Sequence, residues 1–282
     1  MCNILKMDMY RMLKSRITLL CLLGTVAMVA FSVCMTSYDV HYYMAHPDEF
    51  QKVEIIEDGG EDWGIYIGSV MPSWCRGEKV PYANLLENNI QSKMVLLFFV
   101  VFMVGFVSAE QKCRFVQNIS GQVSDRGQIM VSKIAVAAVY AMLQMVCICA
   151  VIGMASKLLF GYLNMEHSGR LLLVLGLQIF LQIAFGALVI LIITITRSTI
   201  ASMIIGILLS SGMIQVLDPF IKMVFHVKKS FSIMYYTLSG NIGMIHSGSS
   251  RQNLERAFVI AFAVLAVTGY VSGWIARIRD VE

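Results

Sequence analysis

Six stretches of this chain contain no charged side chain and are apolar almost throughout, and they constrain its fold more than any other feature. They cover residues 17–37, 94–109, 134–156, 171–196, 198–217 and 257–276. A helix needs about 20 apolar residues to cross the roughly 30 Å hydrocarbon core of a membrane. Only 14% of the residues are charged, against about 25% in soluble proteins. The pattern predicts an all-α membrane protein with six transmembrane helices.

Charged borders and polar insertions divide the chain further. We expect a cytoplasmic interfacial helix at 1–16, an extracellular insert at 38–92, a cytoplasmic coupling loop at 110–133, an extracellular loop at 157–170, an extracellular interfacial or re-entrant segment at 218–255 and a cytoplasmic tail at 277–282. The spans between them are predicted at 17–37, 93–109, 134–156, 171–196, 198–217 and 257–276. We expect residues 89–93 to extend the short second span, with Lys93 snorkelling to the interface.

The N-terminal segment combines four basic residues with apolar residues at roughly helical spacing. Its basic side chains are Lys6, Arg11, Lys14 and Arg16. This pattern is typical of an amphipathic helix on the membrane surface, and equally of a basic flank that orients the first span. Both interpretations place the N-terminus, and with six spans the C-terminus, in the cytoplasm. The predicted location is the plasma membrane of a bacterial cell.

The two larger polar segments have open roles. The insert 38–92 is rich in acidic residues and has aromatic residues near both ends, as expected near a membrane interface. It is either a structural loop or a surface that contacts cargo. Segment 218–255 is too polar to span and too apolar for a plain loop, which favours short helices that pack on the rest of the protein.

The sequence lacks the motifs of several enzyme classes. It has no Gly-x-x-x-x-Gly-Lys-Ser/Thr phosphate-binding loop, no His-Glu-x-x-His and no Gly-x-Ser-x-Gly. The formal charge of +4 is not gathered in a basic run, so nucleic acid is not an expected partner. We therefore expect no catalytic residue, metal or cofactor in this chain.

Polar and small residues inside the spans are the next candidates. Gln144, Gln178 and Gln182 either form hydrogen bonds between helices or line a cargo path. Small residues recur every fourth position, which permits close helix packing within the chain or between subunits. They are Ser202, Gly206, Ser210, Gly269 and Gly273.

The coupling loop 110–133 is the one long polar interruption on the predicted cytoplasmic side. Phe115, Val116 and Ile119 form one apolar face of a short amphipathic helix, and such a helix fits a groove on another protein. The alternative is a plain polar loop.

Several of these features together resemble a known family. The interfacial N-terminal helix, the six spans and the coupling loop are similar to the permease subunit of a type-2 ABC exporter. The motif positions are Glu110, Ser120, Arg126, Gly127, Ile129, Ser132 and Lys133, and the tail Arg277-Ile-Arg-Asp280 also matches. One departure is Arg114-Phe115, where the family often has Gly-Thr.

The resemblance implies a permease that dimerises with a second permease chain and binds separate cytoplasmic ATPase subunits. The residues it assigns to ATPase coupling are Glu110, Phe115, Val116, Ile119, Arg126 and Lys133. The cargo would be apolar or amphipathic: a drug, an antimicrobial peptide or a lipid-linked molecule. The rival hypothesis is a non-transporting membrane scaffold or sensor that binds a partner through the acidic insert.

Overall fold

Helices make up nearly all of the structure, a computed structural model that describes residues 2–46, 67, 70–112, 127–164, 168–214, 218, 223 and 232–278. Over this part of the chain no β-strand forms, which confirms the all-α class. The elements are α1 (Cys2–Lys14), α2 (Arg16–Ala45), α4 (Pro72–Cys75), α5 (Tyr82–Gln91), α6 (Met94–Lys112), α8 (Gly127–Leu159), η1 (Ser168–Arg170), α9 (Leu171–Thr196), α10 (Thr199–Ser210), η3 (Ile233–Tyr236), α12 (Leu238–Met244) and α13 (Arg251–Ile278).

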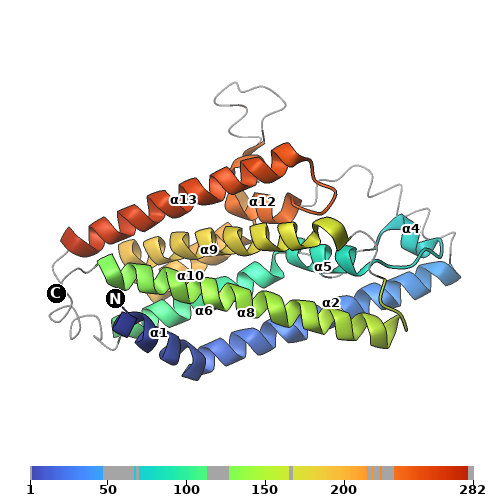
Figure 1. Cartoon of the computed structure of the whole chain (residues 1–282), viewed down its shortest axis with the longest axis horizontal. Coiled ribbons are helices and arrows are strands. Elements are labelled where there is room, and N and C mark those ends of the chain that lie inside the picture. The colour runs from blue at the N-terminus through green and yellow to red at the C-terminus, as the bar shows by residue number, and fades with distance from the viewer. Residues whose placement is uncertain are drawn as a thin grey trace.

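The long helices lie side by side in an elongated bundle, and α1 and the last turns of α13 lie at one end of it (Figure 1). We call this the terminal end; it holds α1, the last turn of α6 and the first turns of α8. The other end, called the insert end, holds α4, α5, α12 and the first turns of α9 and α13. The two ends of the bundle are therefore built from different helices.

Several of the helices have the length and composition of membrane spans. Within the described residues, α2, α8, α9 and α13 are each long and apolar enough to cross a membrane, and the bent pair of α5 and α6 gives a fifth span if it is taken as one. The chain is thus a multi-pass membrane protein. The fifth expected span, at 198–217, corresponds to a helix of only 12 residues, α10. That helix ends where Gly212 adopts a left-handed backbone with φ of 78°.

The second span is broken rather than simply extended. Helix α5 meets α6 at an angle of 49° across Ser92 and Lys93. Lys93 has a left-handed backbone with φ of 62°, which only glycine adopts without cost. Its side chain is 2% exposed, so it does not snorkel as expected. Much of the insert is also helical: α2 continues to Ala45, and Leu86 and Ile90 of α5 are part of the core.

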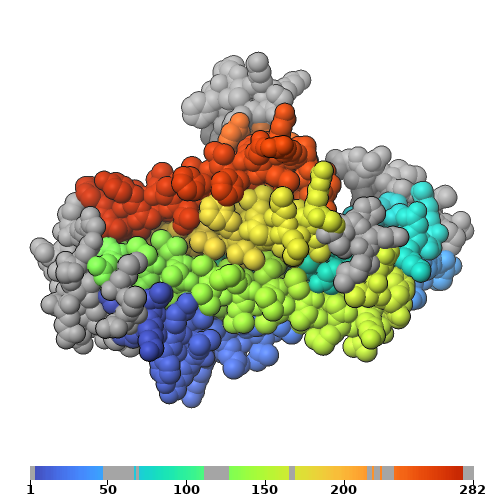
Figure 2. All heavy atoms as spheres, in the orientation of Figure 1, coloured from blue at the N-terminus to red at the C-terminus, as the bar shows by residue number. Residues whose placement is uncertain are grey.

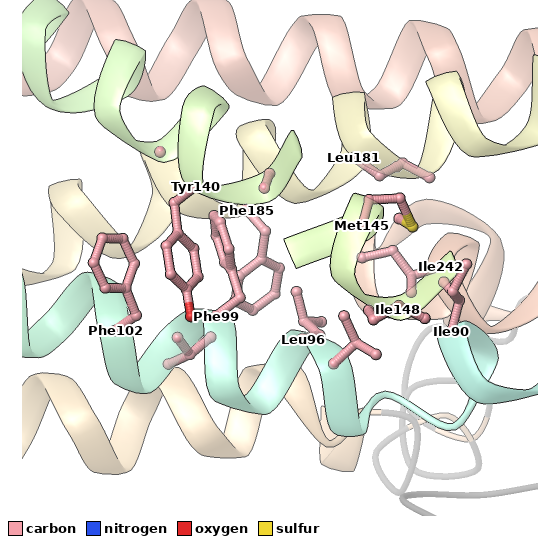
Figure 3. Close-up of a cluster of buried hydrophobic side chains, with 14 of the residues drawn as sticks. Ile90, Leu96, Phe99, Phe102, Tyr140, Met145, Ile148, Leu181, Phe185 and Ile242 are labelled. Atoms are coloured by element: carbon pink, nitrogen blue, oxygen red, sulfur yellow. The ribbon is translucent and has the colours of Figure 1, made fainter. Parts of the chain in front are cut away.

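The core lies where α6, α8 and α9 meet (Figure 3). The Tyr140 ring of α8 stacks on Phe102 of α6 with centroids 3.7 Å apart, and Phe99 lies beside it at 6.0 Å. Lipid tails are as apolar as these side chains, so close packing rather than exclusion of water supplies most of the attraction inside a membrane. Interlocking aromatic rings provide such contacts.

Candidate functional site

Helix α1 presents one narrow face to the bundle. Asp8 and Met12, four residues apart, are almost completely buried, whereas Tyr10 and Leu13 are exposed. Residues i and i+4 share a face of an α-helix, so this spacing directs one carboxylate inward. Ser15 is extended and ends α1, and the Thr18 hydroxyl donates to the Met12 carbonyl at 2.6 Å. This turn holds α1 against the start of α2.

A buried ionic network forms where α1 meets α6 and α8. The Arg11 guanidinium donates to Glu110 Oε1 at 2.7 Å and lies 3.4 Å from Asp8 Oδ1. The Lys133 ammonium donates to the other Glu110 oxygen, and the Ser132 hydroxyl donates to Asp8 Oδ2. We call these five residues, Asp8, Arg11, Glu110, Ser132 and Lys133, the terminal network. It joins three helices through two carboxylates and two cations.

The charges of the terminal network balance, which is what allows them to be buried. The side chains of Glu110 and Lys133 are 2% and 3% exposed, and a single unpaired charge at such a position is costly. Arg11 also lies over the Phe106 ring at 5.4 Å. Burial raises the pKa of Asp8 above its usual value, opposed by Lys133 and the Ser132 hydrogen bond. Asp8 is therefore the carboxylate that burial makes easier to protonate.

Two of the six predicted coupling residues belong to the terminal network. Glu110 and Lys133 flank the coupling loop, and the structure pairs them directly. The other four, Phe115, Val116, Ile119 and Arg126, lie outside the described residues. Sequence reasoning missed Asp8 altogether and treated Arg11 only as part of a basic flank. The local signal for both was an acid and a base three residues apart.

The three predicted glutamines occupy different environments. Gln144 of α8 donates to the Thr25 hydroxyl of α2 and to the Val95 carbonyl of α6, both at 3.0 Å. Gln178 of α9 donates to the Ile242 carbonyl of α12 at 3.0 Å. Gln182 is 1% exposed, and neither of its amide atoms has a partner among the described residues. Two of the three therefore connect helices, as the structural interpretation expects.

The small residues also pack within the chain. Ser202, Gly206 and Ser210 form the buried face of α10. A Cβ at Gly206 would approach Val100 Cγ1 of α6 to 2.7 Å, so α10 and α6 touch at this glycine. A Cβ at Gly269 would meet Ile134 of α8 at 3.7 Å, and one at Gly273 meets no described atom within 4 Å. The α10 ridge serves contacts inside one chain.

Side chains of α5 and α9 hold an irregular segment at the insert end. Glu87 Oε1 accepts from the Ser247 backbone N–H at 2.9 Å and from its hydroxyl. Gln91 donates to the Ile245 carbonyl at 3.1 Å, close to the α12 carbonyl that accepts from Gln178. We call this arrangement the insert-end clamp. It satisfies backbone groups that no helix satisfies.

No group of three or more potential metal-binding side chains occurs among the residues that the structure describes. No protein-family model matches the chain, and a search of curated proteins gives no match either.

Proposed function

We propose that this chain is the permease subunit of an ATP-driven type-2 ABC exporter in a bacterial plasma membrane. In this proposal the terminal end faces the cytoplasm, and a separate ATPase subunit binds the coupling loop. The chain dimerises with a second permease, and the cargo is apolar or amphipathic. The chain itself carries no phosphate-binding loop, so ATP hydrolysis belongs to the partner.

The observation that carries the proposal is the Glu110–Lys133 ion pair. Glu110 lies in the last turn of α6 and Lys133 in the second turn of α8, so the pair ties together the two helices that the coupling loop connects. Arg11 extends the same contact to α1. A displacement of the loop would therefore move α1, α6 and α8 together. Such a rigid joint suits the conversion of ATPase closure into a shift between two states of the spans.

The charge distribution supports the proposed orientation. The terminal end carries Lys6, Arg11, Lys14 and Arg16 on or directly after α1. Lys and Arg near span ends favour the cytoplasmic side. The acidic insert would then lie outside the cell.

Copurification tests the proposal. The tagged chain is expressed in its native host, extracted in mild detergent and assayed for a bound P-loop ATPase. We expect ATPase to copurify with the wild type and with Lys157→Glu, a charge reversal at the insert end where Lys157 is exposed. We expect Arg126→Glu, a reversal in the coupling loop, to lose it. Retention of ATPase by Arg126→Glu, or its absence from the wild type, overturns the proposal and leaves the scaffold or sensor hypothesis.

A further inference from the structure

The insert end contains an open cavity of about 630 Å³ whose walls carry both polar and apolar surface. Ligand pockets are typically about 300–1,000 Å³, so this one holds a group the size of a lipid headgroup or a disaccharide. Its walls come from α5, the junction of η1 with α9, and the 246–248 turn before α13. The surface in Figure 2 is hollowed beside the first turns of α9 and α13. The cavity lies at the far end of the bundle from the terminal network.

Helix α5 turns a polar face toward this cavity. Asn84, Glu87, Asn88 and Gln91 line it and follow the spacing i, i+3, i+4 and i+7, which places them on one side of a helix. The other side of α5 is apolar and buried, with Leu86 fully inside the core. The amide side chains offer both donors and acceptors. A wall of this kind binds a ligand through hydrogen bonds.

The cavity carries one fixed charge of each sign. Glu87 is 6% exposed and is held in place by Ser247, whereas Arg170 at the start of α9 is exposed. Arg170 has no ion-pair partner among the described residues. A guanidinium binds phosphate through two parallel hydrogen bonds, and a carboxylate attracts an amine. The pair is complementary to a zwitterionic group.

An apolar surface begins directly beside the cavity. Leu172 and Leu173 follow Arg170 in the first turn of α9 and are 83% and 58% exposed. Helix α9 has the length and composition of a membrane span, so we expect its first turn to lie at the level where headgroups meet acyl chains. A ligand that fills the cavity and also covers Leu172 and Leu173 must be polar at one end and apolar at the other.

From these features we propose that the insert-end cavity binds a phospholipid whose headgroup carries a phosphate and an amine, as in phosphatidylethanolamine. Arg170 binds the phosphate, Glu87 attracts the ammonium, and the amides of α5 bond the remaining oxygens. The acyl chains run along the first turns of α9. Lipid binding at this site needs neither ATP nor a partner subunit, so its failure would not contradict the proposed transport function.

Native mass spectrometry of the full chain in detergent tests the site. The probes are dioleoyl phosphatidylethanolamine, dioleoyl phosphatidylglycerol and chain-free glycerophosphoethanolamine. We expect the wild type to bind one phosphatidylethanolamine more tightly than the other two probes. Arg170→Ala should weaken this binding about tenfold, the effect of losing a charge-assisted hydrogen bond. Arg170→Lys keeps the charge but loses the planar guanidinium, so its affinity for phosphatidylethanolamine should lie between that of the wild type and that of Arg170→Ala.

Two controls make the result specific. Lys157→Ala removes another exposed cation at the insert end, outside the cavity lining, and should leave lipid binding unchanged. Glu87→Gln keeps the acceptor for Ser247 and should reduce the preference for phosphatidylethanolamine over phosphatidylglycerol. Thermal unfolding of each variant checks that it is folded. Equal binding by the wild type, Arg170→Ala and Lys157→Ala overturns the site. If phosphatidylglycerol binds as tightly as phosphatidylethanolamine, the assigned headgroup is wrong. If chain-free glycerophosphoethanolamine binds as tightly, the acyl-chain contact is wrong.

Discussion

The two ends of the bundle are both held by buried polar groups, but by different kinds. At the terminal end, side chains of opposite charge pair with one another across three helices, as Arg11 and Lys133 do with Glu110. At the insert end, Glu87, Gln91 and Gln178 bond mainly to backbone groups of residues 242–247. The interior of a helix satisfies its own backbone groups, whereas irregular backbone near a membrane must find partners in other parts of the protein.

The difference has a mechanical consequence. A charge-balanced joint keeps its parts together because separating them leaves a buried ion. Hydrogen bonds from neutral amides to carbonyls are individually weaker, about 1 kcal/mol each. We therefore expect the terminal end to move as one rigid unit and the insert end to open more readily.

The largest expected effect comes from breaking the terminal network. Lys133→Met leaves Glu110 with Arg11 alone, and we expect the free energy of unfolding to fall by about 3 kcal/mol, as when one partner of a buried pair is removed. Lys157→Met, at an exposed lysine of the same helix, is the matched control and should change little. Reversible unfolding in detergent, followed by tryptophan fluorescence, measures both.

A double variant separates the pair from the individual residues. Glu110→Gln with Lys133→Met removes both charges, so it should recover much of the loss. If the double variant is as unstable as the sum of the single variants, the two side chains are not coupled as the structure indicates.

At the insert end, two glutamines one turn apart on α9 provide a direct contrast. Gln178→Leu removes the hydrogen bond to the Ile242 carbonyl, and we expect a loss of about 1 kcal/mol in unfolding free energy. Gln182→Leu removes an amide with no partner among the described residues, so it should be neutral or stabilising, because a buried unsatisfied amide carries a desolvation cost. The same unfolding assay compares them. A loss at Gln182 equal to that at Gln178 would show that Gln182 bonds to something in the folded protein.

The terminal network also predicts how stability depends on pH. Burial raises the pKa of Asp8 in the folded protein, so between the ordinary and the raised value the folded state binds more protons than the unfolded state. Stability contributed by Asp8 must then rise as pH falls through this window, by at most about 1.4 kcal/mol per pH unit. We expect the wild type to gain stability relative to Asp8→Asn as pH is lowered from 7. Parallel pH curves for the two proteins would contradict the raised pKa.

The smallest expected effect concerns the two non-glycine residues with left-handed backbone among the described residues, Lys93 and Arg197. Arg197 is exposed and ends α9 at the terminal end, so Arg197→Gly should stabilise by about 0.5–1 kcal/mol through relief of the backbone cost. Lys93 is buried, and its Cε would lie 3.1 Å from a Cβ on Gly243. Lys93→Gly should therefore lose packing that outweighs the relief. Melting temperatures of the two variants should shift in opposite directions.

The contrast also shows where sequence reasoning succeeded. The uncharged run at 171–196 and helix α9 cover the same residues, because Arg170 borders the run and Arg197 turns the chain. Residues 92–93 carry neither glycine nor proline, so the sequence offers no local signal for the break in the second span. The stop of α10 at Ser210 had such a signal, since Gly212 follows it closely.

Sequence reasoning likewise found only part of the terminal network. Glu110 and Lys133 were recognisable because they flank a polar loop between apolar runs. Arg11 lies 99 residues from Glu110 in the chain, and no periodicity connects them. The partner of a buried charge depends on which helices pack together, and that information is spread over the whole bundle.

The sequence by itself determined the helical class and the membrane environment, because both follow from local composition and from the absence of charge over helix-length runs. Only the tertiary structure decided that Asp8, Arg11, Glu110 and Lys133 form one network, that the second span bends at Lys93, and that α5 and the start of α9 border one cavity. These features arise from packing between distant segments. Packing pairs each buried charge with the partner that removes its desolvation cost.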